Sequence, residues 1–413
     1  MTNELNPLLK HVRLNIPECF NEAKIIKKQY SRIVNCLQEA ILPPYEIIIH
    51  PSSICNLKCF WCIGKNIGHT SNRLYPLNSL SDPKNMQKIV KGILDYRIKS
   101  KGWREDTSEH FQVENVSFSG LMGEPLVAKE STLLGMRLLI ENDIRVGLFT
   151  NGILMDEAAI ETILLSAWVH FSIDAGSKKT YSWLKYQGTG ETLFVKVLQN
   201  LNKLAIKKAN SKEAKVEINA GFVLNRFNYA EVYDAARILK NLGVRFLRIK
   251  TDIAQKFLLN SEERKEAKLL LDKIKLKLVD RNFELVEIHT VDKIDNRKRS
   301  FHECFAHKIV GAIGSDGGVY PCNYHPHVTG ICYGNAMERP FREIWEGGQR
   351  KRLFHYIPQK CPPVCDPFKN RVNKLFGVVK RIYCGGKGLG KLGVYKNDLL
   401  TKLRRNTARL ENN

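Results

Sequence analysis

The sequence predicts an α/β protein built on a parallel sheet. Six short runs rich in β-branched and aromatic residues recur along the first 250 residues, and helical patterns separate them. The runs are "YEIIIH" (45–50), "VENVSFS" (113–119), "IRVGLFT" (144–150), "WVHFSID" (168–174), "KVEINAGFV" (215–223) and "VRFLRIK" (244–250). Because strands that alternate with helices are joined by right-handed crossovers, these units predict one parallel sheet covered by helices.

Amphipathic patterns indicate the helices. In residues 191–208, one apolar face is formed by residues at helical spacing, namely Leu193, Val197, Leu201 and Leu204. Further helical patterns span residues 229–243 and 261–282, and another, 18–42, precedes the first strand. We therefore interpret residues 1–44 as an N-terminal helical segment.

The composition is that of a globular protein. The chain has 413 residues, of which 43% are hydrophobic and 26% charged, enough for one large domain or two ordinary ones. The first 20 residues lack the apolar stretch of an export signal, and no run of about 18 apolar residues occurs. We expect a cytoplasmic protein.

The chain has eleven cysteines, an odd number, and no secretory signal, so a disulfide framework is not expected. Cys19 and Cys36 are isolated in helix-like sequence, and we interpret them as small buried hydrophobic residues. The other nine form two groups about 240 residues apart: Cys55, Cys59 and Cys62, then Cys304, Cys322, Cys332, Cys361, Cys365 and Cys384. Clustered thiols in a reducing compartment indicate metal binding.

The first group has the spacing C-x3-C-x2-C within "SSICNLKCFWCIG" (52–64). A closed structural zinc site needs four ligands, and neither His50 nor His69 is well placed to be the fourth. Three thiolates on a short loop instead suit an iron–sulfur cluster with one open iron, which can bind a small molecule and pass it an electron.

This motif resembles the signature of the radical S-adenosylmethionine (radical SAM) superfamily, C-x3-C-x-aromatic-C, through Cys55, Cys59, Trp61 and Cys62. The resemblance implies a (β/α)6 partial TIM barrel over residues 45–290. It also implies a 4Fe-4S cluster with an open iron site and S-adenosylmethionine as cofactors.

The resemblance assigns further residues at strand ends, where parallel barrels carry their chemistry. Gly123 and Glu124 match a turn that binds the methionyl amine, Ser172 and Asp174 match positions that face the ribose, and Trp61 would lie near the adenine.

Alternative interpretations remain for these residues. The family's glycine run is broken here by Leu121 and Met122, and Glu124 could be an ordinary turn residue before Pro125. "SIDAG" could be a strand end with an Asx turn, and "TNG" (150–152) is as typical of a plain turn as of a ligand contact.

The C-terminal region changes character. "ECFAHKIVGAIGSDGGVYPCNYHP" (303–326) predicts a β-hairpin, and "GNAMERPFREIWEGGQRKRLF" (334–354) contains a short helix before the paired thiols of "KCPPVCDP" (360–367). This set resembles the SPASM or twitch extension of radical SAM enzymes. The resemblance implies an auxiliary-cluster domain over residues 300–386.

The cysteine count indicates one auxiliary 4Fe-4S cluster rather than two. Four thiols suffice for one closed cluster, and we assign Cys304, Cys322, Cys361 and Cys365. Zinc is the main alternative, since four thiolates also satisfy it. Cys332 and Cys384 remain; Cys384 could be a cluster ligand in place of one of the paired thiols, a catalytic hydrogen donor or an inert residue.

The formal net charge is +23, and residues 369–413 hold 12 basic and 2 acidic residues. The basic tail, 387–413, could contact an anionic surface or could simply be solvated. No RNA-binding motif accompanies it, so specific nucleic-acid binding is not expected.

The resemblance implies a radical SAM oxidoreductase or epimerase reduced by a donor such as flavodoxin or ferredoxin. Residues 1–44 are too short for a leader-peptide-binding module, so the substrate expected from the sequence is a small polar, sugar-derived metabolite. The alternatives are a peptide maturase acting on a ribosomally made peptide and a non-catalytic protein that binds an iron–sulfur cluster or zinc.

Overall fold

The computed structural model describes residues 25, 28–66, 76–101, 108–120, 123–186, 191–253, 256–288, 301, 303–326 and 330–361, together with nine positions between 365 and 380. Cys19, Cys384 and the basic tail lie outside the described residues, so the expectations for them stay predictions. No helix in the described part of the chain is long and apolar enough to cross a membrane.

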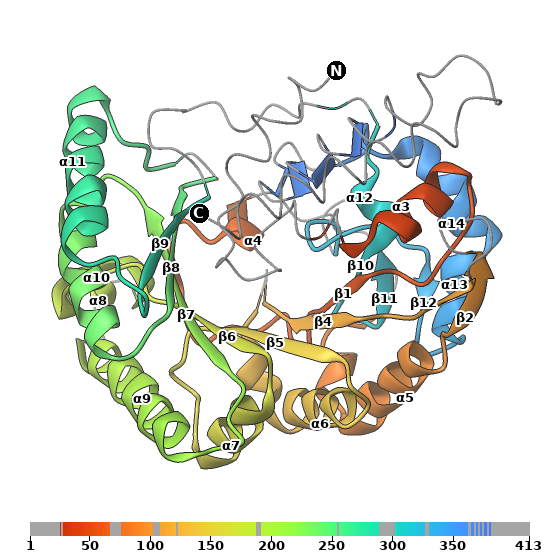
Figure 1. Ribbon diagram of the computed structural model, residues 1–413, viewed down its shortest axis with the longest axis horizontal. Coiled ribbons are helices and arrows are strands. Elements are labelled where there is room, and N and C mark those ends of the chain that lie inside the picture. The colour runs from red at the N-terminus through yellow and green to blue at the C-terminus, as the bar shows by residue number, and fades with distance from the viewer. Residues whose placement is uncertain are drawn as a thin grey trace, which may run out of the picture.

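In the part of the chain that the structure describes, a sheet of ten strands forms the centre, and it curves around a concave side (Figure 1). The strand order is β12-β11-β10-β1-β4-β5-β6-β7-β8-β9. The strands are β1 (Glu46–Ile49), β4 (Asn115–Phe118), β5 (Arg145–Thr150), β6 (Trp168–Ser172), β7 (Glu217–Leu224), β8 (Phe246–Thr251), β9 (Glu284–Glu287), β10 (Val310–Ile313), β11 (Gly318–Tyr320) and β12 (Gly334–Asn335). All neighbours from β1 to β9 pair in parallel. The predicted α/β class and all six predicted strands are confirmed.

Helices cover the convex face of the sheet (Figure 1). They are α5 (Pro83–Leu94), α6 (Lys129–Ile140), α7 (Glu157–Leu165), α8 (Lys178–Tyr186), α9 (Glu191–Asn210), α10 (Val232–Asn241) and α11 (Ser261–Lys277). Their apolar sides and the outward side chains of the strands form one core, which includes Met136, Val146 and Leu201. This burial is the main stabilising term and leaves the concave side for function.

Helix α11 ends five residues before the end of its predicted range. The Asp280 carboxylate accepts hydrogen bonds from the backbone N–H groups of Asn282 and Phe283, at 2.7 and 2.9 Å. This turn leads into β9, a parallel strand that the sequence analysis did not predict. A separate two-stranded hairpin, β2 (Ile98–Lys101) with β3 (Ser108–Phe111), was also not predicted.

The predicted C-terminal hairpin is present as antiparallel β10 and β11, followed by α13 (Phe341–Glu346) and α14 (Gly348–Leu353). Strand β10 pairs in parallel with β1, so the hairpin extends the same sheet that contains the core strands. In the described part of the N-terminal segment, α3 (Tyr30–Leu37) shares a second apolar cluster with Phe305 and Phe376, and Cys36 is buried in it as expected.

Candidate active site

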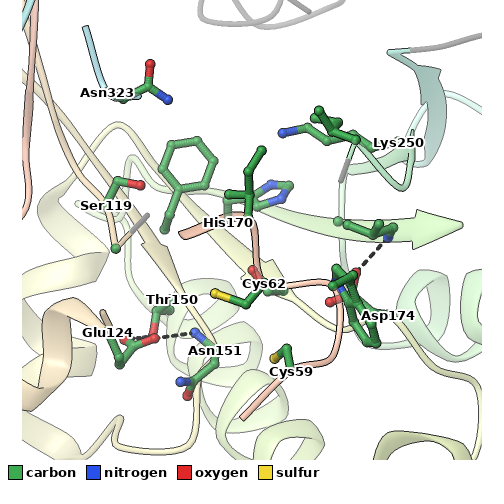
Figure 2. A pocket seen from close by; sticks show the side chains of 18 of the residues that line it. Cys59, Cys62, Ser119, Glu124, Thr150, Asn151, His170, Asp174, Lys250 and Asn323 are labelled. Atoms are coloured by element: carbon green, nitrogen blue, oxygen red, sulfur yellow. Dashed lines mark hydrogen bonds between the residues drawn. The ribbon is translucent and has the colours of Figure 1, made fainter. Parts of the chain in front are cut away.

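A cavity of about 350 Å³ opens at the carboxyl ends of the parallel strands. Every residue assigned to the radical SAM site from the sequence lines it: Cys55, Cys59, Trp61, Cys62, Gly123, Glu124, Ser172 and Asp174. Figure 2 shows Cys59 and Cys62 near one end of the cavity, Lys250 and Asn323 toward the other, and His170 between them. Segments more than 100 residues apart thus meet at one edge of the sheet, as parallel barrels require.

The cysteine loop is held against the end of α8. The backbone N–H of Lys58 donates to the carbonyl of Lys185 at 2.8 Å, and that of Phe60 donates to the carbonyl of Leu184 at 3.2 Å. Trp61 is buried beside the cavity, whereas its neighbour Phe60 contacts the exposed ring of Trp183, with centroids 5.2 Å apart. The aromatic residue of the motif therefore lies on the cavity side.

The donor set of this loop fits a four-iron cluster with one open position. Cys55, Cys59 and Cys62 are all free thiols, and all three line the same cavity. Among the residues that the structure describes, no three His, Cys, Asp or Glu side chains converge as ligands of a single metal ion. Three soft thiolates facing one space would hold three of the four irons.

Gly123 and Glu124 contact the cysteine loop directly. The backbone N–H of Glu124 donates to the carbonyl of Ile54 at 2.9 Å, one residue before Cys55. A Cβ atom on Gly123 would lie only 2.2 Å from the carbonyl oxygen of Ser52, so no larger residue fits there without backbone movement. The absence of a side chain at Gly123 allows the turn after β4 to pack against the loop.

The Glu124 carboxylate is buried and already accepts hydrogen bonds from the protein. Thr150 Oγ1 donates to it at 2.6 Å and the backbone N–H of Asn151 at 2.8 Å, as Figure 2 shows. The Asn151 side chain in turn donates to Asn56 Oδ1, at 2.8 Å, in the cysteine loop. Burial raises the pKa of Glu124, while these hydrogen bonds oppose the shift. Glu124 thus links the "TNG" turn to the loop, and its contact with the methionyl amine stays a prediction.

Replacing Glu124 by Ala is expected to weaken S-adenosylmethionine binding by about 1–3 kcal/mol, because a charge-assisted contact is lost. The same change should lower the free energy of unfolding by a similar amount, because the Thr150 hydroxyl and the Asn151 N–H lose their acceptor. Anaerobic calorimetry and urea unfolding measure the two effects. Thr150→Val is the matched control, because it keeps the carboxylate and should keep the affinity. Unchanged affinity in Glu124→Ala would leave the carboxylate a purely structural role.

Asp174 occupies a strained turn after β6 and forms a buried ion pair. Its φ is +58°, in the left-handed region, and its carboxylate lies 2.8 Å from Lys185 Nζ. The other carboxylate oxygen accepts from the backbone N–H of Val223 at 2.7 Å. Burial opposes the charge of Lys185, but Asp174, followed by Tyr181 and Cys59, raises the pKa of this lysine above its usual value. Ser172, the second predicted ribose residue, offers its backbone carbonyl to the same ammonium group.

Three of the thiols assigned to the auxiliary cluster lie within electrostatic range of the fourth, Cys365. The pKa of the Cys365 thiol is raised by burial and, in addition, by the other three thiols of the set, Cys304, Cys322 and Cys361. Two of them contact polar groups of the protein: Asn373 Nδ2 lies 3.5 Å from Cys304 Sγ, and His325 Nε2 lies 3.4 Å from Cys361 Sγ. Four thiols, two of them beside hydrogen-bonding groups, are a donor set suited to a closed iron–sulfur cluster.

Cys332 has a different environment. It is buried in the second apolar cluster, and its thiol donates to the carbonyl of Gly334 at 3.4 Å. Cys332→Ala is therefore expected to keep about eight irons per chain after anaerobic reconstitution, whereas Cys322→Ala should lose up to about four. Iron analysis of the two variants tests the assignment, and a loss of iron in Cys332→Ala would contradict it.

Several polar residues that line the cavity were not predicted from the sequence, among them His170, Lys185, Arg248 and Lys250. Burial, followed by the charge of Arg248, lowers the pKa of His170 well below its usual value, so the imidazole is neutral. Arg248 and Lys250 alternate with apolar residues of β8, and this spacing was a usable signal. Nothing local in the sequence marks Lys185 or His170.

Comparison with known proteins agrees with this geometry. The sequence model of the radical SAM superfamily matches residues 49–212, and that of the SPASM iron–sulfur cluster-binding domain matches residues 304–367. The PqqA peptide cyclase of Granulibacter bethesdensis is 22% identical over 339 residues, which cover 78% of this chain and 79% of that protein.

Two solved structures share the fold. Streptococcus suis SuiB bound to S-adenosylmethionine has a TM-score of 0.54 and 15% identity, over 88% of this chain and 82% of that chain. The anSMEcpe protein with bound AdoMet has a TM-score of 0.52 and 18% identity, over 86% of this chain and 98% of that chain.

The cysteine loop at the mouth of a parallel partial barrel defines a protein that binds S-adenosylmethionine at an open iron–sulfur cluster. The chain belongs to the radical SAM superfamily and carries a C-terminal SPASM domain. Its cofactors are a 4Fe-4S cluster and S-adenosylmethionine. The SPASM domain binds auxiliary iron–sulfur clusters.

Proposed function

We propose that this radical SAM enzyme modifies a peptide. The observation that carries the proposal is the match to a peptide cyclase along 78% of this chain and 79% of that protein. SuiB, whose fold is similar, has also been solved with its precursor peptide SuiA, with a TM-score of 0.52 over 84% of this chain. These relatives favour the peptide alternative over the sugar-derived metabolite that the short N-terminal segment suggested.

The residues that line the cavity have different roles in this proposal. A reduced four-iron cluster with S-adenosylmethionine at its open iron would supply the one-electron radical chemistry that removes a hydrogen atom from a substrate C–H bond. Cys55, Cys59 and Cys62 would hold that cluster, and the buried Trp61 keeps water from one wall. The protein contributes orientation and water exclusion, so the chemical step needs no side-chain nucleophile.

The auxiliary site supports an oxidative modification. Asn323 and Tyr324, which directly follow the assigned ligand Cys322, line the same cavity as the cysteine loop. The auxiliary thiols are therefore connected to the cavity wall, where an electron could leave the substrate. We propose oxidation as the outcome, with a flavodoxin or ferredoxin as the external electron donor.

The test measures 5′-deoxyadenosine formed anaerobically by the reconstituted, reduced protein with a small-molecule and peptide fraction of a cell extract. A peptide substrate should raise the rate above the basal rate, and digestion of the fraction with a nonspecific protease should remove the increase. Periodate oxidation of sugars in a parallel sample should leave it intact. The opposite pattern, with an increase that survives protease and is lost to periodate, would overturn the peptide proposal.

A further inference from the structure

One end of the cavity is lined by basic side chains that the proposed radical chemistry does not use. Arg248 and Lys250 occupy alternate positions on β8, so both side chains lie on the same face of the sheet, and both line the cavity. Lys369, from the C-terminal region, lines the cavity as well. In Figure 2, the amine of Lys250 points into the cavity from the side opposite Asn323.

The carboxylates in this cavity have other partners. Asp174 forms the 2.8 Å ion pair with Lys185. The Asp252 carboxylate accepts from the backbone N–H groups of Lys256 and Phe257, each at 2.9 Å. Asp174 is thereby paired with a cation other than Arg248 and Lys250.

Two further carboxylates of the cavity lining, Glu46 and Asp366, act on Lys369. Burial opposes the charge of Lys369, but Glu46 and then Asp366 raise the pKa of this lysine. The Asp366 side chain also accepts from the backbone N–H of Lys369 at 3.1 Å. At the same end of the cavity, the buried Nε and Nη1 atoms of Arg248 donate no hydrogen bond to any described residue.

The ammonium group of Lys250 forms no hydrogen bond or ion pair with any residue that the structure describes. Burial, followed by the charge of Arg248, lowers the pKa of Lys250 to about 8, although Asp366 and Asp174 oppose the shift. A partly buried ammonium group beside a guanidinium is costly unless an anion joins them.

We propose that Arg248 and Lys250 form a subsite for a carboxylate of the substrate. The guanidinium offers a planar pair of donors and the ammonium a compact charge, a combination suited to one carboxylate. The inference rests on the proposed function where it takes the substrate as a peptide. The carboxylate then belongs either to an acidic side chain or to the peptide's C-terminus.

The test uses Lys250 as its own reporter in the reconstituted holoenzyme with S-adenosylmethionine, under anaerobic conditions. An amine-acetylating reagent is applied near pH 8, and acetylation of Lys250 is followed by mass spectrometry. The probes, at millimolar concentration, are acetyl-Ala-Glu-Ala-amide, acetyl-Ala-Gln-Ala-amide, acetyl-Ala-Gln-Ala with a free carboxylate, and glucuronate. A carboxylate at the subsite should slow acetylation about five-fold or more, because a nearby opposite charge raises a pKa by about 1–3 units.

Protection by the Glu peptide identifies a side-chain carboxylate, and protection by the free-acid Gln peptide identifies a C-terminal one. The amidated Gln peptide should have no effect, and the exposed Lys91 should react at the same rate throughout. In Arg248→Met, protection should require a higher probe concentration. Arg245→Met is the matched control, since Arg245 precedes the same strand and pairs with Glu284 at 3.1 Å, away from the cavity lining.

The outcomes separate this inference from the proposed function. If no carboxylate probe slows acetylation of Lys250 in the wild-type protein, the subsite proposal is wrong whatever the substrate. If glucuronate protects Lys250 and neither peptide carboxylate does, the carboxylate subsite is supported and the peptide proposal is contradicted. Iron content and circular dichroism check that the two arginine variants are folded.

Discussion

Replacing Cys55, Cys59 and Cys62 together by Ala is expected to lower the iron content of the reconstituted protein from about eight to about four per chain. The cleavage of S-adenosylmethionine to 5′-deoxyadenosine should fall to background. All three thiols line the cavity, while the auxiliary thiols belong to the C-terminal region and should keep their iron. Iron and sulfide analysis with chromatography of the nucleoside measures both effects.

Cys36→Ala provides the matched control for this variant. Cys36 is also a free thiol, but it is buried in the apolar cluster around α3. Its removal should leave iron content and S-adenosylmethionine cleavage unchanged. Unaltered iron in the triple variant would refute the assignment of the loop, and wild-type protein that takes up zinc but no iron would refute the cluster itself.

Replacing Lys185 by Met is expected to lower the free energy of unfolding by about 3–5 kcal/mol, because the Asp174 carboxylate is left buried without its partner. The two side chains are 2% and 5% exposed, so water cannot replace the lost ammonium group. Lys185 Nζ also donates to the carbonyl of Ser172, and that acceptor would be left unsatisfied. Urea unfolding of the cluster-free protein measures the change.

The double variant Asp174→Asn with Lys185→Met tests the cause. Because it removes both charges, it should be more stable than Lys185→Met alone. Lys91→Met, which breaks an exposed ion pair with Asp95 on α5, should change stability by less than about 1 kcal/mol. A Lys185→Met protein as stable as the wild type would contradict the importance assigned to the buried pair.

The strands that the sequence predicted are runs rich in β-branched and aromatic residues between clear breaks. Residues 45–50 and 144–150 are of this kind, and both form central strands buried on two faces. Strand β9 was missed because "ELVE" is short, carries a charge at each end and follows closely on a helical pattern. It is a strand because β8 offers it a parallel edge, and that information is not local.

The candidate site divides in a similar way. The spacing of Cys55, Cys59 and Cys62 was enough to predict a cluster-binding loop, because all three ligands lie within eight residues. The buried ion pair between Asp174 and Lys185 left no such signal, since nothing in sequence shows that a helix residue turns inward. Lys250 could be predicted only in part. Its alternation with Arg248 could be read from the sequence, but the cavity that both side chains line could not.

By itself, the sequence determined the chemistry available to this protein: three thiols on one loop, a second thiol set near the C-terminus and alternating strands and helices that form a parallel sheet. Only the tertiary structure decided what these groups contact. Strand register brings Glu124 to Thr150. Packing on α8 brings the cysteine loop to Lys185. The reason is physical: thiol spacing and strand periodicity are local properties of the chain, whereas charge pairing and cavity lining depend on contacts between distant segments.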